Sequence, residues 1–125
     1  TIPKWAPGDA GLDLHSAVDV TIARQSRAIV PLGIATQFPL QYVGILKDRS
    51  GNASKGRHIH GGVIDSGYRG EWRVIFENTG DDWNIKKGDR IAQVLFLPCF
   101  HLLIKTVDSL SDSVRGSSGF GSSGV

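Results

Sequence analysis

The sequence predicts an all-β domain, and three observations support that fold class. Short apolar runs rich in β-branched residues recur at roughly 8–12-residue spacing, which is typical of a β-sandwich or barrel. Pro31, Pro39 and Pro98 lie at the borders of these runs, where strands tolerate proline. The 125 residues are 40% hydrophobic and 21% charged, so we expect one soluble domain with a real hydrophobic core.

The predicted elements follow one another along the chain. The first strand alternates apolar and polar residues from Val18 to Ile22, the pattern of a half-buried strand. Residues 50–55 are small and polar and predict a single short helix with Ser50 as its N-cap. The other runs with strand composition are Ala28–Val30, Ile34–Phe38, Tyr42–Leu46, Trp72–Glu77, Ile91–Leu97 and Leu102–Val107.

Composition argues against several classes of function. The formal net charge of +2 is too small to make nucleic acid the main partner, and the loose basic cluster at Lys47, Arg49, Lys55 and Arg57 has no aromatic series. That cluster fits a small phosphorylated ligand at least as well. No apolar run approaches the roughly 20 residues of a membrane span, and the first residues do not have the pattern of a signal peptide. A lone cysteine, Cys99, suits a reducing compartment, so we expect an intracellular protein.

The stretch Gly61–Glu71 predicts a β-hairpin that leads into the strand from Trp72. Its tip carries one carboxylate, Asp65, and one tyrosine, Tyr68, bordered by glycines that let a backbone approach a small ligand. An ordinary hairpin with polar turn residues explains the same stretch equally well.

Two further stretches could bind phosphate. Arg49, Ser50 and Gly51 combine an arginine fork, a hydroxyl and backbone N–H groups at a helix start, although a capped surface turn has the same composition. Gln93 is a polar residue inside an apolar run, where it faces either a ligand or solvent.

The C-terminal residues 115–125 are rich in glycine and serine, as in a linker. Arg115 and Phe120 have no purpose in an inert linker, whereas a mobile lid could use the cation on phosphate and the ring on a base. We therefore expect residues 1–114 to form the domain and residues 115–125 to form a flexible C-terminal arm.

Taken together and in this order, five stretches resemble the five motifs of the trimeric dUTPases (dUTP pyrophosphatases). Each motif alone is weak, but five in order at plausible spacing are hard to obtain by chance. The stretches are Ala10–Leu14, Arg49–Gly56, Gly62–Glu71, Gly88–Gln93 and Arg115–Gly124.

The resemblance implies a distorted β jelly-roll barrel in a homotrimer, with active sites at the subunit interfaces. It implies hydrolysis of dUTP to dUMP and pyrophosphate, which keeps uracil out of DNA and supplies dUMP for dTMP synthesis. Mg²⁺ would bind across the triphosphate, and Asp13 would contact the metal only through water. Two alternatives stay open: a dCTP deaminase-type enzyme of the same fold, and a non-catalytic dUTPase-like binding protein.

The resemblance also implies roles for single residues. Asp65 would be the general base that activates a water for attack on the α-phosphorus. Tyr68 would stack under the deoxyribose and leave no room for a 2′-hydroxyl. The implied substrate contacts are Arg49, Ser50, Gly51 and Gln93 to phosphates, Gly62, Val63 and Ile64 to uracil, Arg115 to the γ-phosphate, and Phe120, Gly121, Ser122 and Ser123 as cover.

Two residues depart from the family pattern. Asp48 precedes Arg49 and adds an anion that is unfavourable near a triphosphate, and Asn52 replaces a usually apolar or small residue. The Leu97–Cys99 stretch and the absence of methionine suggest a retrovirus-type enzyme cut from a polyprotein. We expect the protein to act inside the cell, in the cytoplasm or nucleus, or within a virion if it is retrovirus-type.

Overall fold

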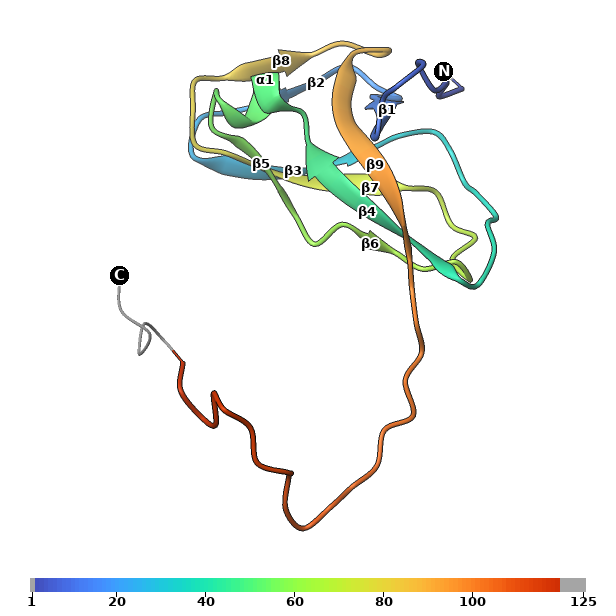
Figure 1. The fold of residues 1–125 in the computed structure, drawn as a ribbon. Helices are drawn as coiled ribbons and strands as arrows, with labels where there is room; N and C mark the ends of the chain where they lie inside the picture. The colour runs from blue at the N-terminus through green and yellow to red at the C-terminus, as the bar shows by residue number, and fades with distance from the viewer. Residues whose placement is uncertain (1, 120–125) are drawn as a thin grey trace.

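The computed structural model describes residues 2–119, which form three β-sheets and one short helix (Figure 1). The strand orders are β1-β9-β4-β6 in the largest sheet, β2-β8 in the second and β3-β7-β5 in the third. This confirms the prediction of an all-β fold with at most one short helix. The elements are β1 (Leu12–His15), β2 (Val20–Ile22), β3 (Ser26–Pro31), β4 (Tyr42–Asp48), α1 (Ser50–Ala53), β5 (Arg57–His60), β6 (Val63–Ile64), β7 (Arg73–Asn78), β8 (Trp83–Ile85) and β9 (Arg90–Pro98).

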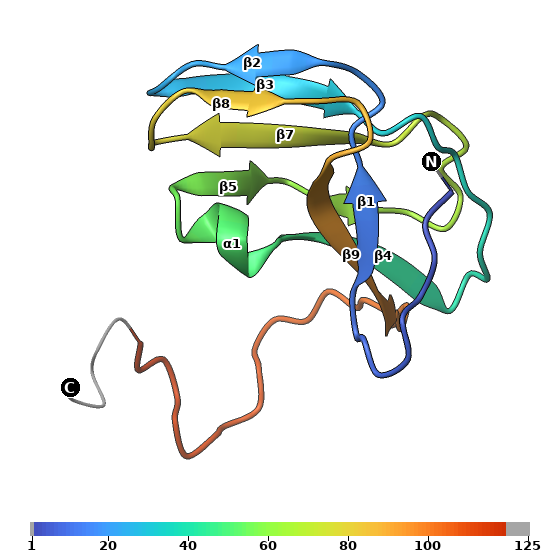
Figure 2. The same cartoon turned by 90° about the horizontal axis from the view of Figure 1, so that it is seen from above.

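The hydrophobic core lies between the sheets, because all three contribute side chains to one buried cluster. Leu14 and Val94 come from the four-stranded sheet and Phe76 from the three-stranded sheet. Trp83 comes from β8, and its ring meets that of Phe76 edge to face at 5.0 Å between centroids. Figure 2 shows β1, β9 and β4 on one side of the molecule and β2, β3, β7 and β8 on the other.

Strand β9 organises the four-stranded sheet, because it pairs with β1 on one edge and with β4 on the other. The register places Asp13 of β1 opposite Gln93 of β9, and Gln93 opposite Lys47 of β4. Residues directly opposite one another project from the same face of a sheet. The sheet therefore brings residues from three distant parts of the sequence into one row.

The alternation in the sequence located most of the long strands. Val74, Phe76 and Asn78 of β7 are buried, whereas the alternate residues Arg73 and Ile75 are exposed. The predicted strands at Ile34–Phe38 and Leu102–Val107 are wrong, since neither segment pairs with another strand in the part of the chain that is described.

The predicted hairpin over Gly61–Glu71 is also wrong. Strand β6 pairs with β4, with Ile64 opposite Gly44, and not with β7. Both edges of β7 are already occupied, by β3 and by β5. The stretch is instead a connection between two sheets, with a turn in which the Tyr68 N–H donates to the Asp65 carbonyl at 3.0 Å.

The helix begins one residue earlier than predicted and ends at Ala53. Arg49 is the N-cap and makes no side-chain capping bond, while Ser50 is the first helical residue. The Asn52 side chain ties the helix to β9 by donating from Nδ2 to the Ile91 carbonyl at 2.9 Å. Among the described residues, no helix has the length and hydropathy needed to cross a bilayer.

Candidate functional site

A polar cavity of about 490 Å³ lies where β1, β9 and the end of β4 meet. It gathers predicted phosphate-binding residues from stretches that are far apart in the sequence. The residues that line the cavity are Asp9, Ala10, Gly11, Asp13, Arg49, Ser50, Gly51, Arg90 and Gln93.

The Asp13 carboxylate holds two arginines at this cavity. Its Oδ1 accepts from Arg49 Nε at 2.8 Å, and its Oδ2 accepts from Arg90 Nη1 at 3.2 Å. Arg49 is anchored further by a 3.4 Å bond from Nη1 to the Arg90 carbonyl. About a third of the Asp13 and Arg49 side chains is exposed, so this ion pair is partly shielded from solvent. The guanidinium groups are thereby positioned before any ligand binds.

The Gln93 amide has a defined orientation. Its Nε2 donates to the Asp48 carbonyl at 2.8 Å. Its Oε1 lies over Gly11, so closely that a Cβ at position 11 would overlap that oxygen. One Nε2 hydrogen thus remains for a ligand.

The lining carries two cations, Arg49 and Arg90, and two carboxylates, Asp9 and Asp13. Its formal charge is therefore zero, and the cavity alone cannot neutralise a polyanion. A phosphorylated ligand would need additional positive charge from a metal ion or from another part of the protein.

Asp65 and Tyr68 lie elsewhere, in the connection between β6 and β7. Both are exposed, and the Tyr68 hydroxyl donates to the Glu71 carbonyl at 3.1 Å. The tyrosine ring packs against Gly70, where a Cβ would overlap the phenol. These contacts hold the ring in one place without burying it.

The pairing of β6 with β4 gives an estimate of the backbone separation between the Asp65 segment and the polar cavity. Ile64 pairs with Gly44, whereas Arg49 follows five residues further along the chain. At about 3.3 Å per strand residue, that separation is roughly 16 Å. Figure 1 shows β6 beside β4 and α1 beyond the end of β4. One chain does not bring Asp65 and Arg49 together.

The remaining predicted site residues that the structure describes also lie outside the polar cavity. Ile64 is buried, so only its main chain is available to a ligand, and the Gly62 carbonyl already accepts from the Leu46 N–H at 2.8 Å. Arg115 is exposed, and its Nε donates to the Ser118 carbonyl at 3.0 Å. Phe120, Gly121, Ser122 and Ser123 lie outside the described residues.

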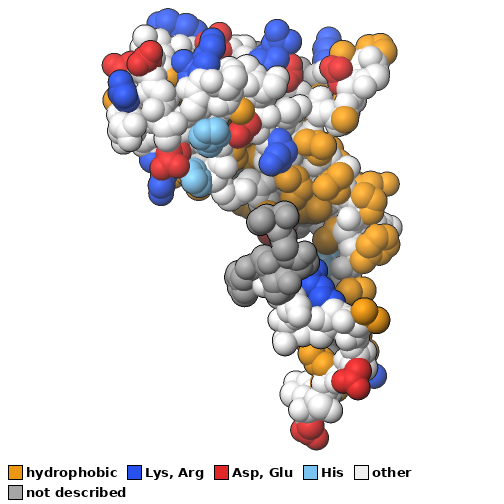
Figure 3. Space-filling view, turned by 60° about the vertical axis from the view of Figure 1, so that its left-hand side comes forward, with side chains coloured by type: hydrophobic (Ala, Val, Ile, Leu, Met, Phe, Trp, Pro, Cys, Tyr) orange, Lys and Arg blue, Asp and Glu red, His pale blue; other side chains and the backbone are white. Residues whose placement is uncertain are grey.

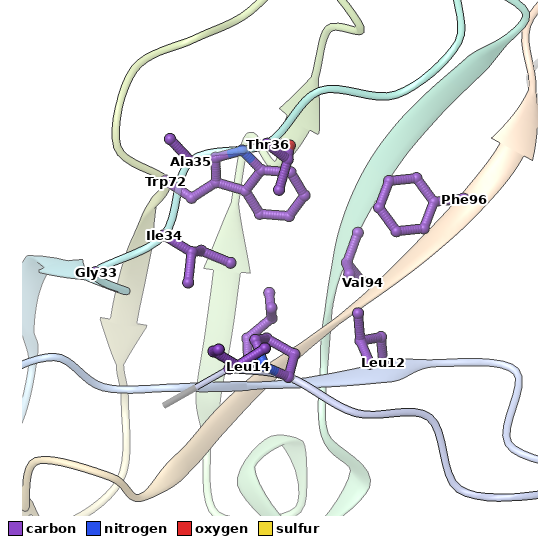
Figure 4. Close-up of a pocket in the computed structure, with 11 residues that line it drawn as sticks. Leu12, Leu14, Gly33, Ile34, Ala35, Thr36, Trp72, Val94 and Phe96 are labelled. Carbon is purple, nitrogen blue, oxygen red and sulfur yellow. The ribbon is translucent and has the colours of Figure 1, made fainter.

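A second cavity, of about 410 Å³, lies between β1, β9 and the segment after β3 (Figure 4). Its lining includes Ile34, Phe96 and Trp72 and has no charged side chain, which argues against a phosphate site. Within the described residues, the buried Trp72 Nε1 and Thr36 Oγ1 have no hydrogen-bond partner.

Comparison with known proteins identifies the family. The family model described as dUTPase matches residues 1–124. The chain belongs to the dUTPase family. A swinepox virus deoxyuridine 5′-triphosphate nucleotidohydrolase is 44% identical over 120 residues, covering 94% of this chain and 84% of the relative. The corresponding protein of Leifsonia xyli subsp. xyli is 43% identical over 133 residues, covering 98% of this chain and 85% of the relative.

Solved dUTPase structures share the fold. The Staphylococcus bacteriophage 80alpha dUTPase with dUPNHPP has a TM-score of 0.94 at 32% identity, covering 100% of this chain and 92% of that one. A mutant dUTPase from phage phi11 of S. aureus has a TM-score of 0.83 at 26% identity, covering 90% of this chain and 92% of that one, and coordinates a structural Mg(II) ion. The resemblance inferred from the five motifs is confirmed.

The dUTPase motifs also contain residues to which the sequence assigned no role. Gly11 and Arg90 were recognised only as parts of the first and fourth motifs, yet both line the polar cavity. Their contacts join residues far apart in the chain, since Arg90 and Asp13 are separated by 77 positions. Only the strand register, which the sequence does not display, brings them together.

Proposed function

We propose that this chain is a dUTP diphosphatase that hydrolyses dUTP to dUMP and pyrophosphate. The observation that carries the proposal is the polar cavity, which assembles Arg49, Ser50, Gly51 and Gln93 beside Asp13. Its relatives carry the name of this hydrolase. The retained Asp65 and Tyr68 favour this activity over a dCTP deaminase-type enzyme or a non-catalytic binding protein.

The phosphates would lie in the polar cavity. Arg49 Nε donates to Asp13, so the terminal Nη2 group of Arg49 is available to a phosphate oxygen. Gln93 would donate its second Nε2 hydrogen on the α-phosphate side. Ser50 and Gly51 lie at the start of α1, and a Cβ at Gly51 would meet no atom of this chain. The space beside Gly51 is therefore open to a ligand.

The cavity fits Mg²⁺ that arrives with the substrate better than a resident ion. Among the described residues, no group of three His, Cys, Asp or Glu side chains could hold a metal. Both Asp13 oxygens are occupied by arginines, so we expect Asp13 to reach a metal only through water. Bound across the triphosphate, Mg²⁺ would supply the positive charge that the lining lacks.

Asp65 would act as the general base. Its carboxylate would take a proton from a water as the water oxygen forms a bond to the α-phosphorus. The bond from that phosphorus to the bridging oxygen breaks, and pyrophosphate leaves with the electron pair. Tyr68, held by its bond to the Glu71 carbonyl, would stack under the deoxyribose. Main-chain groups of Gly62, Val63 and Ile64 would contact uracil.

A substrate assay tests the activity. We expect pyrophosphate from dUTP in the presence of Mg²⁺ and little from UTP, dTTP or dCTP. Ammonia from dCTP would instead indicate a deaminase, and binding of dUTP without turnover would indicate a binding protein. Asp65→Asn should abolish turnover and retain dUTP binding, because the amide preserves shape but cannot accept the proton. Loss of both would contradict the role of Asp65 as base.

The active site would be shared between subunits of a homotrimer. A water on Asp65 must touch the α-phosphate, but in one chain Arg49 is bonded to Asp13 on the β1 edge of the sheet, while Asp65 follows β6 on the opposite edge, with a backbone separation of roughly 16 Å along β4. The segment of residues 100–114, here called the connecting segment, supports this, since its apolar side chains are largely in solvent (Figure 3). They are Phe100, Leu102, Leu103, Ile104, Val107, Leu110 and Val114.

The connecting segment of a neighbouring subunit would cover the apolar cavity. Leu102–Val107 and Ile34–Phe38 both have strand composition and no strand partner within the described residues. A neighbouring backbone could also satisfy the unpaired Trp72 Nε1 and Thr36 Oγ1. The arm that follows would bring Arg115 and Phe120 to a site on another subunit.

Mixed trimers test the shared site. Asp65→Asn and Arg49→Ala chains are each expected to be inactive, but their mixture should regain about a quarter of wild-type activity per site, because random assembly pairs an intact Asp65 with an intact Arg49 at that frequency. A gel-filtration mass near three subunits should accompany the recovery. If the unfolded and refolded mixture remains inactive although trimeric, both groups act within one chain.

A further inference from the structure

Asp48 is the last residue of β4, and its side chain holds the start of the turn that carries Arg49, Ser50 and Gly51. Its Oδ1 accepts from the Ile59 N–H of β5 at 2.7 Å, and its Oδ2 lies 3.3 Å from His58 Nδ1. The side chain is 26% exposed and does not line the polar cavity. The carboxylate therefore faces β5 and is not an anion directed at the triphosphate.

The main chain of Asp48 acts on the opposite side, at β9. Its carbonyl accepts the Gln93 amide at 2.8 Å and so fixes which end of that amide faces the cavity. If the amide turned over, Oε1 would point toward an anionic phosphate and repel it. Asp48 thus links β5, through its carboxylate, to the orientation of Gln93, through its carbonyl.

We propose that Asp48 is a positioning residue for triphosphate binding, and this inference rests on the proposed function. The carboxylate locks the end of β4 against β5. That lock fixes the Asp48 carbonyl under Gln93 and the starting point of the Arg49 side chain. The bond from Asn52 to the Ile91 carbonyl holds the other side of the turn, so loss of the Asp48 bond loosens the turn without releasing it.

Two substitutions distinguish a positioning role of Asp48 from simple repulsion between its negative charge and the triphosphate. Asp48→Asn keeps an oxygen that can accept from the Ile59 N–H but removes the charge. Asp48→Ala removes both the acceptor and the charge. A positioning role predicts that only the alanine variant binds triphosphate more weakly, whereas repulsion by the anion predicts tighter binding in both variants.

The experiment measures the affinity of each protein for dUpNHpp, the dUTP analogue bound in a phage dUTPase structure, by calorimetry with Mg²⁺. We expect about a tenfold rise in Kd for Asp48→Ala, as for one lost hydrogen bond to a charged group, and a Kd within about twofold of wild type for Asp48→Asn. In the Gln93→Ala background, Asp48→Ala should weaken binding much less, because the group that it positions is gone.

Every other pattern overturns the proposal. Tighter binding by both variants means that the charge alone matters, unchanged binding by both means that Asp48 has no role, and equal weakening means that the acceptor oxygen is not sufficient. If Asp48→Ala does not fold, Asp48→Glu, which displaces the carboxylate by one methylene, replaces it with the same expectation. A wild type that neither binds dUpNHpp nor hydrolyses dUTP would refute the proposed function itself.

Discussion

Gly11→Ala should impair triphosphate binding while leaving the fold almost as stable as before. An added Cβ would overlap Gln93 Oε1 and lie 2.9 Å from Gln93 Cδ, so the glutamine side chain must move. Gly11 does not have the positive φ that favours glycine, so alanine fits its backbone. The substitution therefore acts through Gln93 rather than through backbone strain.

The expected magnitudes follow from these contacts. Moving Gln93 breaks its bond to the Asp48 carbonyl, which costs about 0.5–1.5 kcal/mol of stability. Replacing glycine by alanine returns roughly 0.4–1 kcal/mol by restricting the unfolded chain. The melting temperature should thus change by less than about 4 °C. Loss of a hydrogen bond to a charged phosphate is worth about 1.5–3 kcal/mol, so KM for dUTP should rise roughly ten- to hundredfold.

A double-mutant cycle supplies the control. Steady-state kinetics and thermal unfolding are measured for Gly11→Ala, Gln93→Ala and the double variant. Because the Gln93→Ala substitution leaves space for the new methyl group, the double variant should be no worse than Gln93→Ala alone. Additive losses in kcat/KM would refute the argument that Gly11 is required to make room for the glutamine amide.

Two other predictions concern stability. Gly56→Ala should destabilise the fold by at least about 2 kcal/mol, because φ is +72° and the new Cβ would lie 2.5 Å from Thr79 Oγ1. Gly8→Ala is the control: φ is +88° but no atom lies near the new Cβ, so the loss of stability should be only about 1 kcal/mol. If urea unfolding gives the same loss for both variants, the contact with Thr79 has no effect on stability. Burial lowers the pKa of His15 below 6.5, against the opposing effect of Asp13, so the folded state binds this proton less readily than the unfolded state. The contribution of His15 to the free energy of unfolding should be complete above pH 6.5 and be lost as the pH falls through the lower folded pKa. His15→Gln should flatten this dependence of stability on pH. A His15→Gln variant whose stability falls with pH as steeply as that of the wild type would contradict the prediction.

The sequence predicted strands well where burial alone creates the pattern. Alternation marks β7, and a long apolar run marks β9, because the first has one solvated face and the second is central in its sheet. Short strands such as β1 and β8 were missed, since their pairing with distant partners defines them more than their composition does. For the same reason, the sequence joined β6 to β7, although β6 pairs with β4.

The sequence pointed to the proposed phosphate-binding stretches because their residue types carry the chemistry, but it did not show the contacts that orient their side chains. The sequence suggests that Asp48 is an unfavourable anion, but its carboxylate faces the Ile59 N–H, which lies 11 residues further along in a different sheet. Asn52 departs from the family pattern, but it ties α1 to β9. Both side chains are satisfied by main-chain groups, and a sequence does not show which main-chain groups will be near.

The register of strand β4 determines how the proposed catalysis would depend on the proposed trimer. Its Gly44 and Ile45 pair with β6, the strand that precedes Asp65, and its end leads into Arg49, so the pairing register fixes the separation between the proposed base and the proposed phosphate site. The Arg49 side chain is bonded to Asp13 of β1, whereas Asp65 follows β6, and β1 and β6 are the opposite edges of the sheet. A side-chain rotation therefore does not close the backbone separation of roughly 16 Å along β4. A subunit that bound triphosphate alone would thus hold it away from its own Asp65, and turnover would wait for a neighbour. If the chain forms the proposed trimer, dilution that dissociates it should abolish turnover, and adding inactive Asp65→Asn chains, which still supply Arg49, should restore turnover.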